Sequence, residues 1–111
     1  MLIFIGEDYE TLGLSPEQMQ ERMGRWVKWS QKMTADGVEH HGDALHSPVT
    51  RLSGPSRTRT DMAAAEVKEL VGGYYTVKVN DLDAAVEVAQ GYPDYDLGGT
   101  VEVREVMVME F

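Results

Sequence analysis

The stretch TDMAAAEVKELVGGYYTVKVNDLDAAVE, residues 60–87, decides the fold of this chain. Residues 61–70 form a short segment rich in helix-forming side chains, and the glycine pair at 72–73 predicts that this helix ends there. Residues 74–79 then alternate between two faces, which is typical of a strand with one buried side. The buried side is expected to carry Tyr75, Val77 and Val79.

A second helix follows this strand. Asn80 or Asp81 is placed to cap it, because a short polar side chain accepts a hydrogen bond from the first free backbone amides. The helix is expected to end at Gly91, since glycine adopts the helix-ending left-handed backbone without strain. Residues 92–99 predict a loop, and the alternating residues 100–109 predict the last strand.

Two elements precede the deciding stretch at the N-terminal end. Residues 1–5 are an unbroken apolar run, which predicts a buried strand, and residues 6–14 predict a loop. Ser15 and Gln18 match a capping box, so we expect a long amphipathic helix that begins there and stops at Gly37. The stripe expected to face the core contains Met19, Met23, Trp26, Ser30 and Met33, with Trp29 at its edge.

Residues 38–45 predict a further strand, because they lie between a helix-ending glycine and the breaker Pro48. His41 and Asp43 would then face one way and His40 the other, since side chains alternate along a strand.

A ragged hairpin is predicted from residues 49–52 and 57–60, around a Ser-Gly-Pro-Ser turn. Three arginines, Arg51, Arg57 and Arg59, gather here in an otherwise acidic protein. They are interpreted either as solvated charges that deter strand pairing at a sheet edge or as a mouth that attracts anions, and the sequence leaves both interpretations open.

The order of these elements predicts one α+β domain over residues 1–111, with two helices on one face of an antiparallel sheet. The other face would be open, and an open face with aromatic and apolar residues usually meets a partner. A homodimer through this face is the simplest expectation, because two-fold assemblies are the commonest. The open face is expected to carry Tyr74, Thr76, Arg104, Val106 and Val108.

Composition narrows the functional classes. The 111 residues include no cysteine, which excludes disulfides, thiolate metal sites and cysteine nucleophiles. The net charge of −9 disfavours binding to nucleic acid, because phosphates would be repelled. The first residues resemble neither a signal peptide nor a membrane span, so we expect a cytoplasmic protein without a membrane partner.

Several motifs in order resemble the YCII-related proteins, and more closely their branch with an Asp-Gly-Pro-Phe motif. The motifs are T-D-x-x-x-x-E-x-K-E, L-x-G-G-Y-Y, D-L-D-x-A-x-E-x-A and G-G-x-V-E-V-R, together with Gly42-Asp43-Ala44-Leu45. The resemblance covers essentially the whole chain and implies a ferredoxin-like domain that dimerises through its sheets into an α/β barrel. In place of Asp-Gly-Pro-Phe this chain has Asp61-Met62-Ala63-Ala64, and Glu105 stands where relatives tend to have proline.

His41 and Asp43 form the first candidate for chemistry. Two residues apart on a strand, they would share a face with Cα atoms roughly 6.5–7 Å apart. A carboxylate near an imidazole raises the pKa of the imidazole and fixes its tautomer, as general acid–base catalysis requires. The alternative is a pair without function, either hydrogen-bonded within the strand or exposed.

Three other residues are candidates. Arg104 lies within an alternating strand and needs either a ligand anion or a carboxylate such as Glu102. Tyr74 could supply a hydroxyl to the same ligand. Asp61 matches an acidic position of the family and is interpreted either as catalytic or as the N-cap of the next helix.

The sequence predicts no cofactor. The histidines and acids of residues 40–46 match no known metal-ligand spacing, and no phosphate-binding loop or nucleophile elbow occurs. One hypothesis is an acid–base enzyme of lyase, isomerase or dehalogenation type, acting on a small anionic or aromatic metabolite in a cleft between sheet and helices. The other is a non-catalytic ligand-binding or regulatory module with the same dimer, and the sequence does not choose between them.

Overall fold

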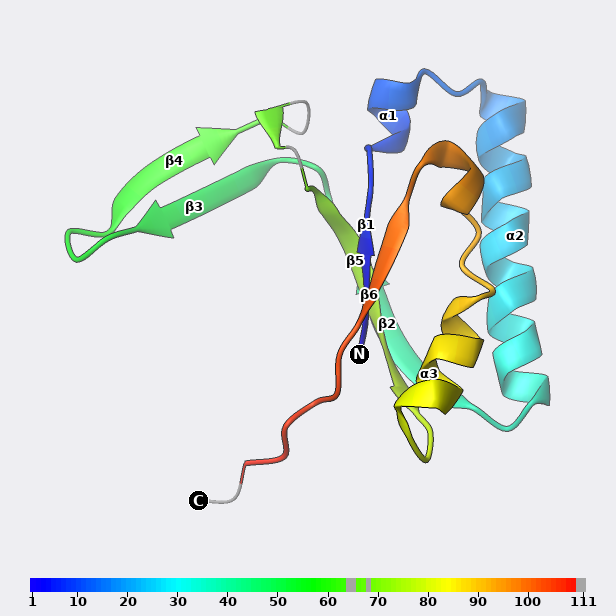
Figure 1. Cartoon of the computed structure of the whole chain (residues 1–111). Coiled ribbons are helices and arrows are strands. Elements are labelled where there is room, and N and C mark those ends of the chain that lie inside the picture. Colours follow the sequence, from blue (N-terminus) through cyan, green and yellow to red (C-terminus); the bar gives the residue numbers. More distant parts are fainter. Residues whose placement is uncertain (64–65, 68, 110–111) are drawn as a thin grey trace.

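The computed structural model describes residues 1–63, 66–67 and 69–109. These residues form a four-stranded antiparallel sheet in the order β2-β5-β1-β6, with helices on one face and a separate two-stranded arm (Figure 1). The sheet consists of β1 (Leu2–Ile5), β2 (Glu39–Ala44), β5 (Val71–Lys78) and β6 (Thr100–Val103). The helices are α1 (Tyr9–Leu12), α2 (Pro16–Ala35) and α3 (Leu82–Ala89), and the arm holds β3 (Val49–Ser53) and β4 (Thr58–Met62).

This arrangement confirms the predicted α+β class and the ferredoxin-like sandwich, in which α2 and α3 cover one face of the sheet (Figure 1). No helix among the described residues is both long and apolar enough to cross a membrane. The dimeric barrel stays a prediction.

The start of α2 follows from its local sequence. The Ser15 hydroxyl accepts a hydrogen bond from the Gln18 backbone N–H at 3.1 Å, and the Gln18 side chain accepts one from the Ser15 N–H at 2.8 Å. This is the predicted capping box, which satisfies amides that no helical carbonyl reaches. The predicted buried stripe is only partly right: Trp29 is 5% exposed and lies in the core, whereas Met23 is 46% exposed.

An aromatic cluster forms the core between the sheet and α2. Phe4, on the central strand β1, packs its ring edge-on against Trp26 and Trp29 of α2, with ring centres 5.1 and 5.7 Å away. The same ring packs edge-on against Tyr75 of β5 and stacks on Tyr92, each at 5.3 Å. Such ring pairs contribute about 0.5–1.5 kcal/mol each beyond the burial of apolar surface.

Several predicted boundaries are wrong. β5 begins at Val71, so the glycine pair lies inside the strand and does not end a helix. A Cβ on Gly73 would come within 2.8 Å of the Asp43 carbonyl oxygen, and glycine therefore allows β2 and β5 to approach. Residues 6–14, predicted as a loop, contain α1. The predicted helix at 61–70 includes residues 64, 65 and 68, which lie outside the described residues.

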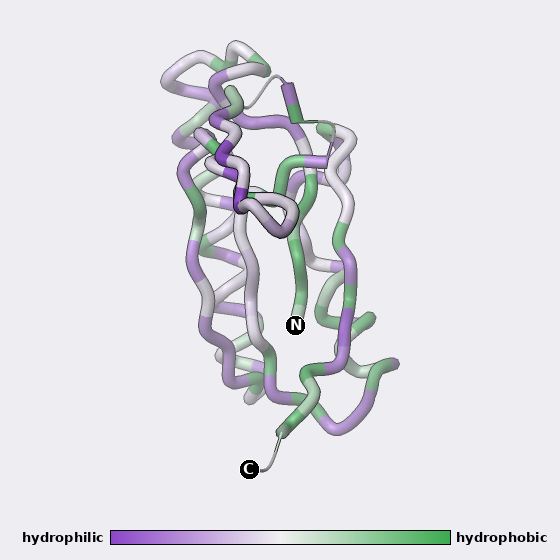
Figure 2. Tube along the Cα trace, turned by 90° about the vertical axis from the view of Figure 1, so that its left-hand side faces the viewer, coloured by the Kyte–Doolittle hydropathy of each residue, from purple (hydrophilic) through white to green (hydrophobic). Residues whose placement is uncertain are grey.

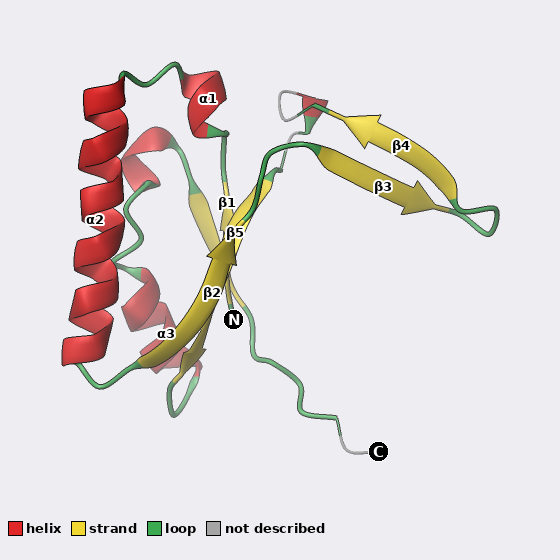
Figure 3. Ribbon diagram, turned by 180° about the vertical axis from the view of Figure 1, so that it is seen from behind, coloured by secondary structure: helices red, strands yellow, loops and turns green. Residues whose placement is uncertain are grey.

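The last strand is shorter than predicted. β6 ends at Val103, which pairs with Leu2, the first residue of β1, and the final backbone hydrogen bonds join Met1 and Arg104. Beyond this point the chain pairs with no strand in the described part of the structure and leaves the sheet (Figure 3). The apolar side chains of this C-terminal segment are exposed, from 51% at Val106 to 85% at Val108. Figure 2 shows the segment as a hydrophobic end of the chain.

The close contact of β2 with β5 at Gly42 gives a test of the fold. A Cβ at Gly42 would lie 1.9 Å from the Tyr74 carbonyl oxygen and 2.4 Å from the Tyr75 ring. We expect Gly42→Ala to lower the free energy of unfolding by about 1–3 kcal/mol, as overpacking does. Gly72→Ala is the matched control, because nothing lies within 4 Å of its Cβ position. Urea unfolding of both variants makes the comparison, and equal stabilities would contradict the packing described.

Candidate functional site

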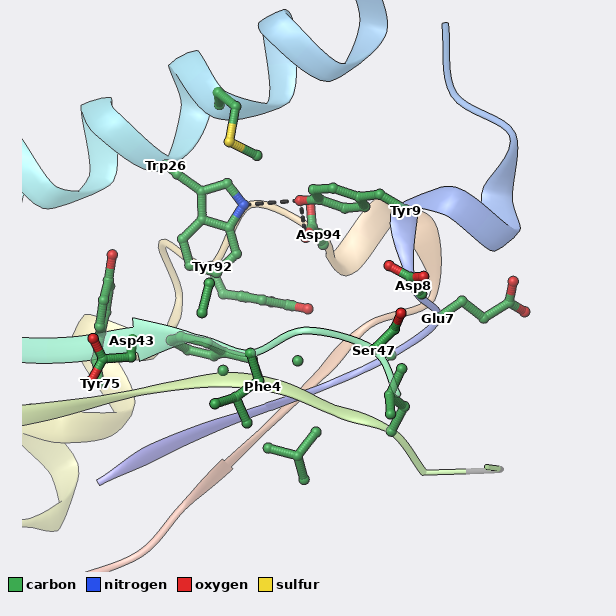
Figure 4. Close-up of a pocket in the computed structure, with 18 residues that line it drawn as sticks. Phe4, Glu7, Asp8, Tyr9, Trp26, Asp43, Ser47, Tyr75, Tyr92 and Asp94 are labelled. Carbon is green, nitrogen blue, oxygen red and sulfur yellow. Dashed lines mark hydrogen bonds between the residues drawn. The ribbon is translucent and has the colours of Figure 1, made fainter. Parts of the chain in front are cut away.

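A cleft of about 380 Å³ lies between the inner face of the sheet, α1 and α2 (Figure 4). Four aromatic residues of the core cluster form part of its walls: Phe4, Trp26, Tyr75 and Tyr92. The cleft therefore opens into the side of the core, where a ligand would meet preformed ring faces and edges.

The far end of the cleft is polar. The Tyr9 hydroxyl donates a hydrogen bond to the Asp94 carboxylate and accepts one from Trp26 Nε1 at 2.9 Å (Figure 4). Burial of this phenol, reinforced by the hydrogen bond to Asp94, raises the pKa of Tyr9 well above its ordinary value. Tyr9 therefore stays protonated and holds the loop of Asp94 against α1 and α2.

A buried arginine of α2, Arg22, holds in place the loop that forms the polar end of the cleft. Arg22 of α2 is 7% exposed, and its guanidinium donates two hydrogen bonds of 2.7 Å to Asp96. It also reaches Asp94 at 3.5 Å and the Pro93 carbonyl oxygen at 3.3 Å. The hydrogen bonds from Arg22 lower the pKa of the Asp96 carboxyl to about 2. The guanidinium of Arg22 therefore fixes the loop that carries Tyr92 and Asp94.

Tyr92 supplies a hydroxyl group at the cleft. Its ring is buried, and its hydroxyl lies close to the backbone of Gly99, where a Cβ would come within 2.4 Å of it. No hydrogen bond within the described part of the chain involves this hydroxyl, and Tyr92 lines the cleft. Burial raises the pKa of Tyr92 to about 12, and the group is therefore a neutral donor at physiological pH.

The charges around the cleft are negative. The acidic residues Glu7, Asp8 and Asp94 line it, whereas none of the described lining residues is lysine or arginine. Asp43 also borders it, but its carboxylate points to the outer face of the sheet and accepts a hydrogen bond from Tyr74. Because like charges repel, this lining disfavours the anionic metabolite expected from the sequence and favours a neutral or cationic one.

The predicted pair of His41 and Asp43 lies elsewhere. Both side chains are on the outer face of the sheet, away from the helices, but they make separate contacts. His41 Nε2 lies 3.4 Å from the Glu39 carboxylate, and Asp43 accepts a hydrogen bond of 2.9 Å from the Tyr74 hydroxyl. That hydrogen bond raises the pKa of Tyr74. His40 faces inward, where its ring contacts the Ser30 hydroxyl at 2.8 Å.

Arg104 and Asp61 do not join His41 and Asp43 within one chain. Arg104 follows β6, at the opposite edge of the sheet from β2, and its side chain is exposed. Asp61, interpreted as a possible helix cap, lies instead in β4. There it accepts a hydrogen bond of 2.8 Å from Thr50, which ties β4 to β3, and one of 3.2 Å from Arg59 within β4 itself. No group of three or more potential metal ligands occurs among the described residues.

Sequence reasoning missed the residues at the polar end of the cleft. Tyr9 and Asp94 lie 85 positions apart in two segments predicted as loops, and no local pattern links them. The one available signal was the Tyr-Pro-Asp-Tyr-Asp run of residues 92–96, since a loop dense in aromatic and acidic residues is a common place for a site.

Comparison with protein families gives one result. The model of the YCII-related domain matches residues 1–110. This match concerns the family as a whole, and membership in its Asp-Gly-Pro-Phe branch stays a prediction. A search of curated proteins found no match.

The ion pair of Arg22 with Asp96 predicts a defined pH dependence of stability. The pKa of Asp96 is about 2 in the fold and ordinarily 3.8, so its stabilising charge is fully present above about pH 4 and is lost as the pH falls toward 2. We expect Asp96→Asn to be less stable than wild type near neutral pH, and the difference to shrink between about pH 4 and 2.

Urea unfolding at a series of pH values makes this measurement. Glu10→Gln is the matched control, because it also removes one exposed carboxylate, and Glu10 has no side-chain partner among the described residues. A stability difference for Asp96→Asn that stays constant down to pH 2 would show that the ion pair does not stabilise the fold.

Proposed function

The chain belongs to the YCII-related domain family, and we propose that this member binds a small molecule in the cleft between the sheet and α2. The ligand class we infer is an aromatic or apolar compound with a cationic or hydrogen-bond-donating group. The observation that carries the proposal is the pairing of aromatic walls with an acidic lining in one cleft.

The size and walls of the cleft favour a ligand of one or two rings. A volume of about 380 Å³ falls at the lower end of the range for small-molecule sites, roughly 300–1,000 Å³. Trp26, Tyr75 and Tyr92 present ring faces or edges, against which a second aromatic ring packs well.

The charges favour a cation at the polar end. Glu7 and Asp8 lie at this end of the cleft with Tyr9 and Asp94, so a positive group there would be attracted by carboxylates (Figure 4). Aromatic faces also attract cations, by about 0.5–2 kcal/mol depending on solvent exposure. The Tyr92 hydroxyl, which is protonated, adds one donor for an uncharged acceptor on the ligand.

Acid–base catalysis on the outer face is a second candidate. It rests on the hydrogen bond between Tyr74 and Asp43, which places a phenol and a carboxylate beside His41. These groups are exposed in a single chain, and lyase, isomerase or dehalogenation chemistry would need a second copy both to exclude water and to supply an arginine such as Arg104. The binding proposal needs neither, and we therefore favour it.

The ligand class can be tested with two probes that share a ring and differ in charge. Tryptamine carries an ammonium group and indole-3-propionate a carboxylate. We expect tryptamine to raise the thermal midpoint, since a ligand at ten times its Kd adds roughly 1.4 kcal/mol to stability. Indole-3-propionate at the same concentration should produce a much smaller rise, because the acidic lining repels it. Equal or stronger stabilisation by the carboxylate would contradict the proposal.

Two variants locate the site of binding. Asp8→Asn should weaken tryptamine binding about 3-fold to 10-fold, since it removes one lining carboxylate and keeps its shape. His41→Ala is the control, because His41 is exposed on the other face of the sheet. If His41→Ala abolishes binding and Asp8→Asn does not, the ligand binds on the outer face and the second candidate is favoured.

A further inference from the structure

Ser30 and His40 face each other between the helix layer and the sheet. Ser30 lies on α2, and His40 points inward from β2, which forms one edge of the sheet. The Ser30 hydroxyl oxygen lies 2.8 Å from Nε2 of the imidazole, and Nδ1 lies 3.1 Å from the backbone carbonyl oxygen of Val38. Both side chains are partly buried, and neither lines the cleft beside Phe4.

The two contacts of His40 fix where its proton lies. A carbonyl oxygen can only accept a hydrogen bond, so Nδ1 of the neutral imidazole must carry the proton that it donates to Val38. Nε2 then has a free lone pair, and the Ser30 hydroxyl donates its hydrogen bond to it. A hydroxyl held by a base, with the base oriented by a third group, is the arrangement that activates a serine nucleophile.

An opening beside this pair gives a substrate access to it. Ser30, His40 and Tyr75 line one hollow at the edge of the sheet. The Tyr75 ring lies beside the imidazole, with ring centres 5.6 Å apart, and no hydrogen bond within the described part of the chain involves its hydroxyl. Burial raises the pKa of Tyr75, so this hydroxyl stays protonated and can donate to a negatively charged oxygen.

We propose that Ser30 is a nucleophile that accepts an acyl group, with His40 as its general base, and that the substrate class is a small aryl ester. Ser30 Oγ forms a bond to the carbonyl carbon of the ester while its proton moves to Nε2 of His40. The bond from that carbon to the aryl oxygen then breaks, and the phenol leaves with the proton from Nε2. Water repeats the sequence on the acyl–Ser30 ester and releases the carboxylic acid, which restores both side chains.

The surroundings of the pair favour a particular size and leaving group of the ester. Because Ser30 and His40 are partly buried between α2 and β2, a small acyl group reaches the hydroxyl more readily than a large one. The Tyr75 ring offers a surface on which an aryl leaving group can stack. The activity does not depend on a ligand in the cleft, because only Tyr75 of these three residues lines both openings.

Labelling with diisopropyl fluorophosphate, which modifies activated serines, tests this proposal. We expect peptide mass spectrometry to place the label on Ser30 of the wild type. His40→Gln should slow the labelling at least about a hundredfold, since a positioned general base contributes roughly 10²–10⁴ to the rate. His46→Gln is the matched control, because it makes the same change at an exposed position after β2. An unlabelled Ser30 in the wild type, or equal labelling rates in the wild type and His40→Gln, would overturn the proposal.

Two further measurements make the test independent of whether one variant folds. Wild type unfolded in urea should lose the labelling, because the contact between Ser30 and His40 depends on the fold, and labelling that persists in urea would contradict the activation described. Ser30→Ala should slow the hydrolysis of p-nitrophenyl acetate at least about tenfold, whereas Ser53→Ala, at an exposed serine of the arm, should leave it unchanged. Hydrolysis that Ser30→Ala retains in full would also overturn the proposal.

Discussion

The packing of Phe4 against four other rings is the interaction on which the rest of the structure depends. Phe4 lies on the central strand, and its ring contacts aromatic side chains from α2, from β5 and from the loop after α3. These segments are distant in sequence, so their common contact fixes the helix layer against the sheet. Phe4, Trp26, Tyr75 and Tyr92 of the same cluster also line the cleft.

The polar groups of the cleft depend on this cluster for their position. Trp26 packs on Phe4 with its ring and donates to the Tyr9 hydroxyl with its nitrogen, so one side chain joins the core to the polar end. Arg22, one turn earlier on α2, holds the loop of Asp94 and Asp96. A site supported on a helix and a central strand is held in place before a ligand arrives, which reduces the entropy lost on binding.

The features predicted correctly are those that depend on residues close together in the sequence. The capping box at Ser15 and the alternation in β5 each depend on residues a few positions apart, and both predictions are confirmed. The site depends instead on contacts such as that between Tyr9 and Asp94, and nothing in the sequence near either residue indicates it. The length of β6 was predicted wrongly for the same reason: β6 pairs along β1, whose four residues match only Thr100 to Val103, and the two strands lie far apart in the sequence.

The central claim is that the cleft beside Phe4 is a ligand site, and mapping backbone amide shifts by NMR during a tryptamine titration tests it most directly. The account predicts that the largest shifts occur at Gly6, Tyr9 and Tyr92, around the polar end of the cleft. The outer face should respond little, including the amides of His41 and Thr76. Shifts concentrated on the outer face, with the cleft unchanged, would contradict it.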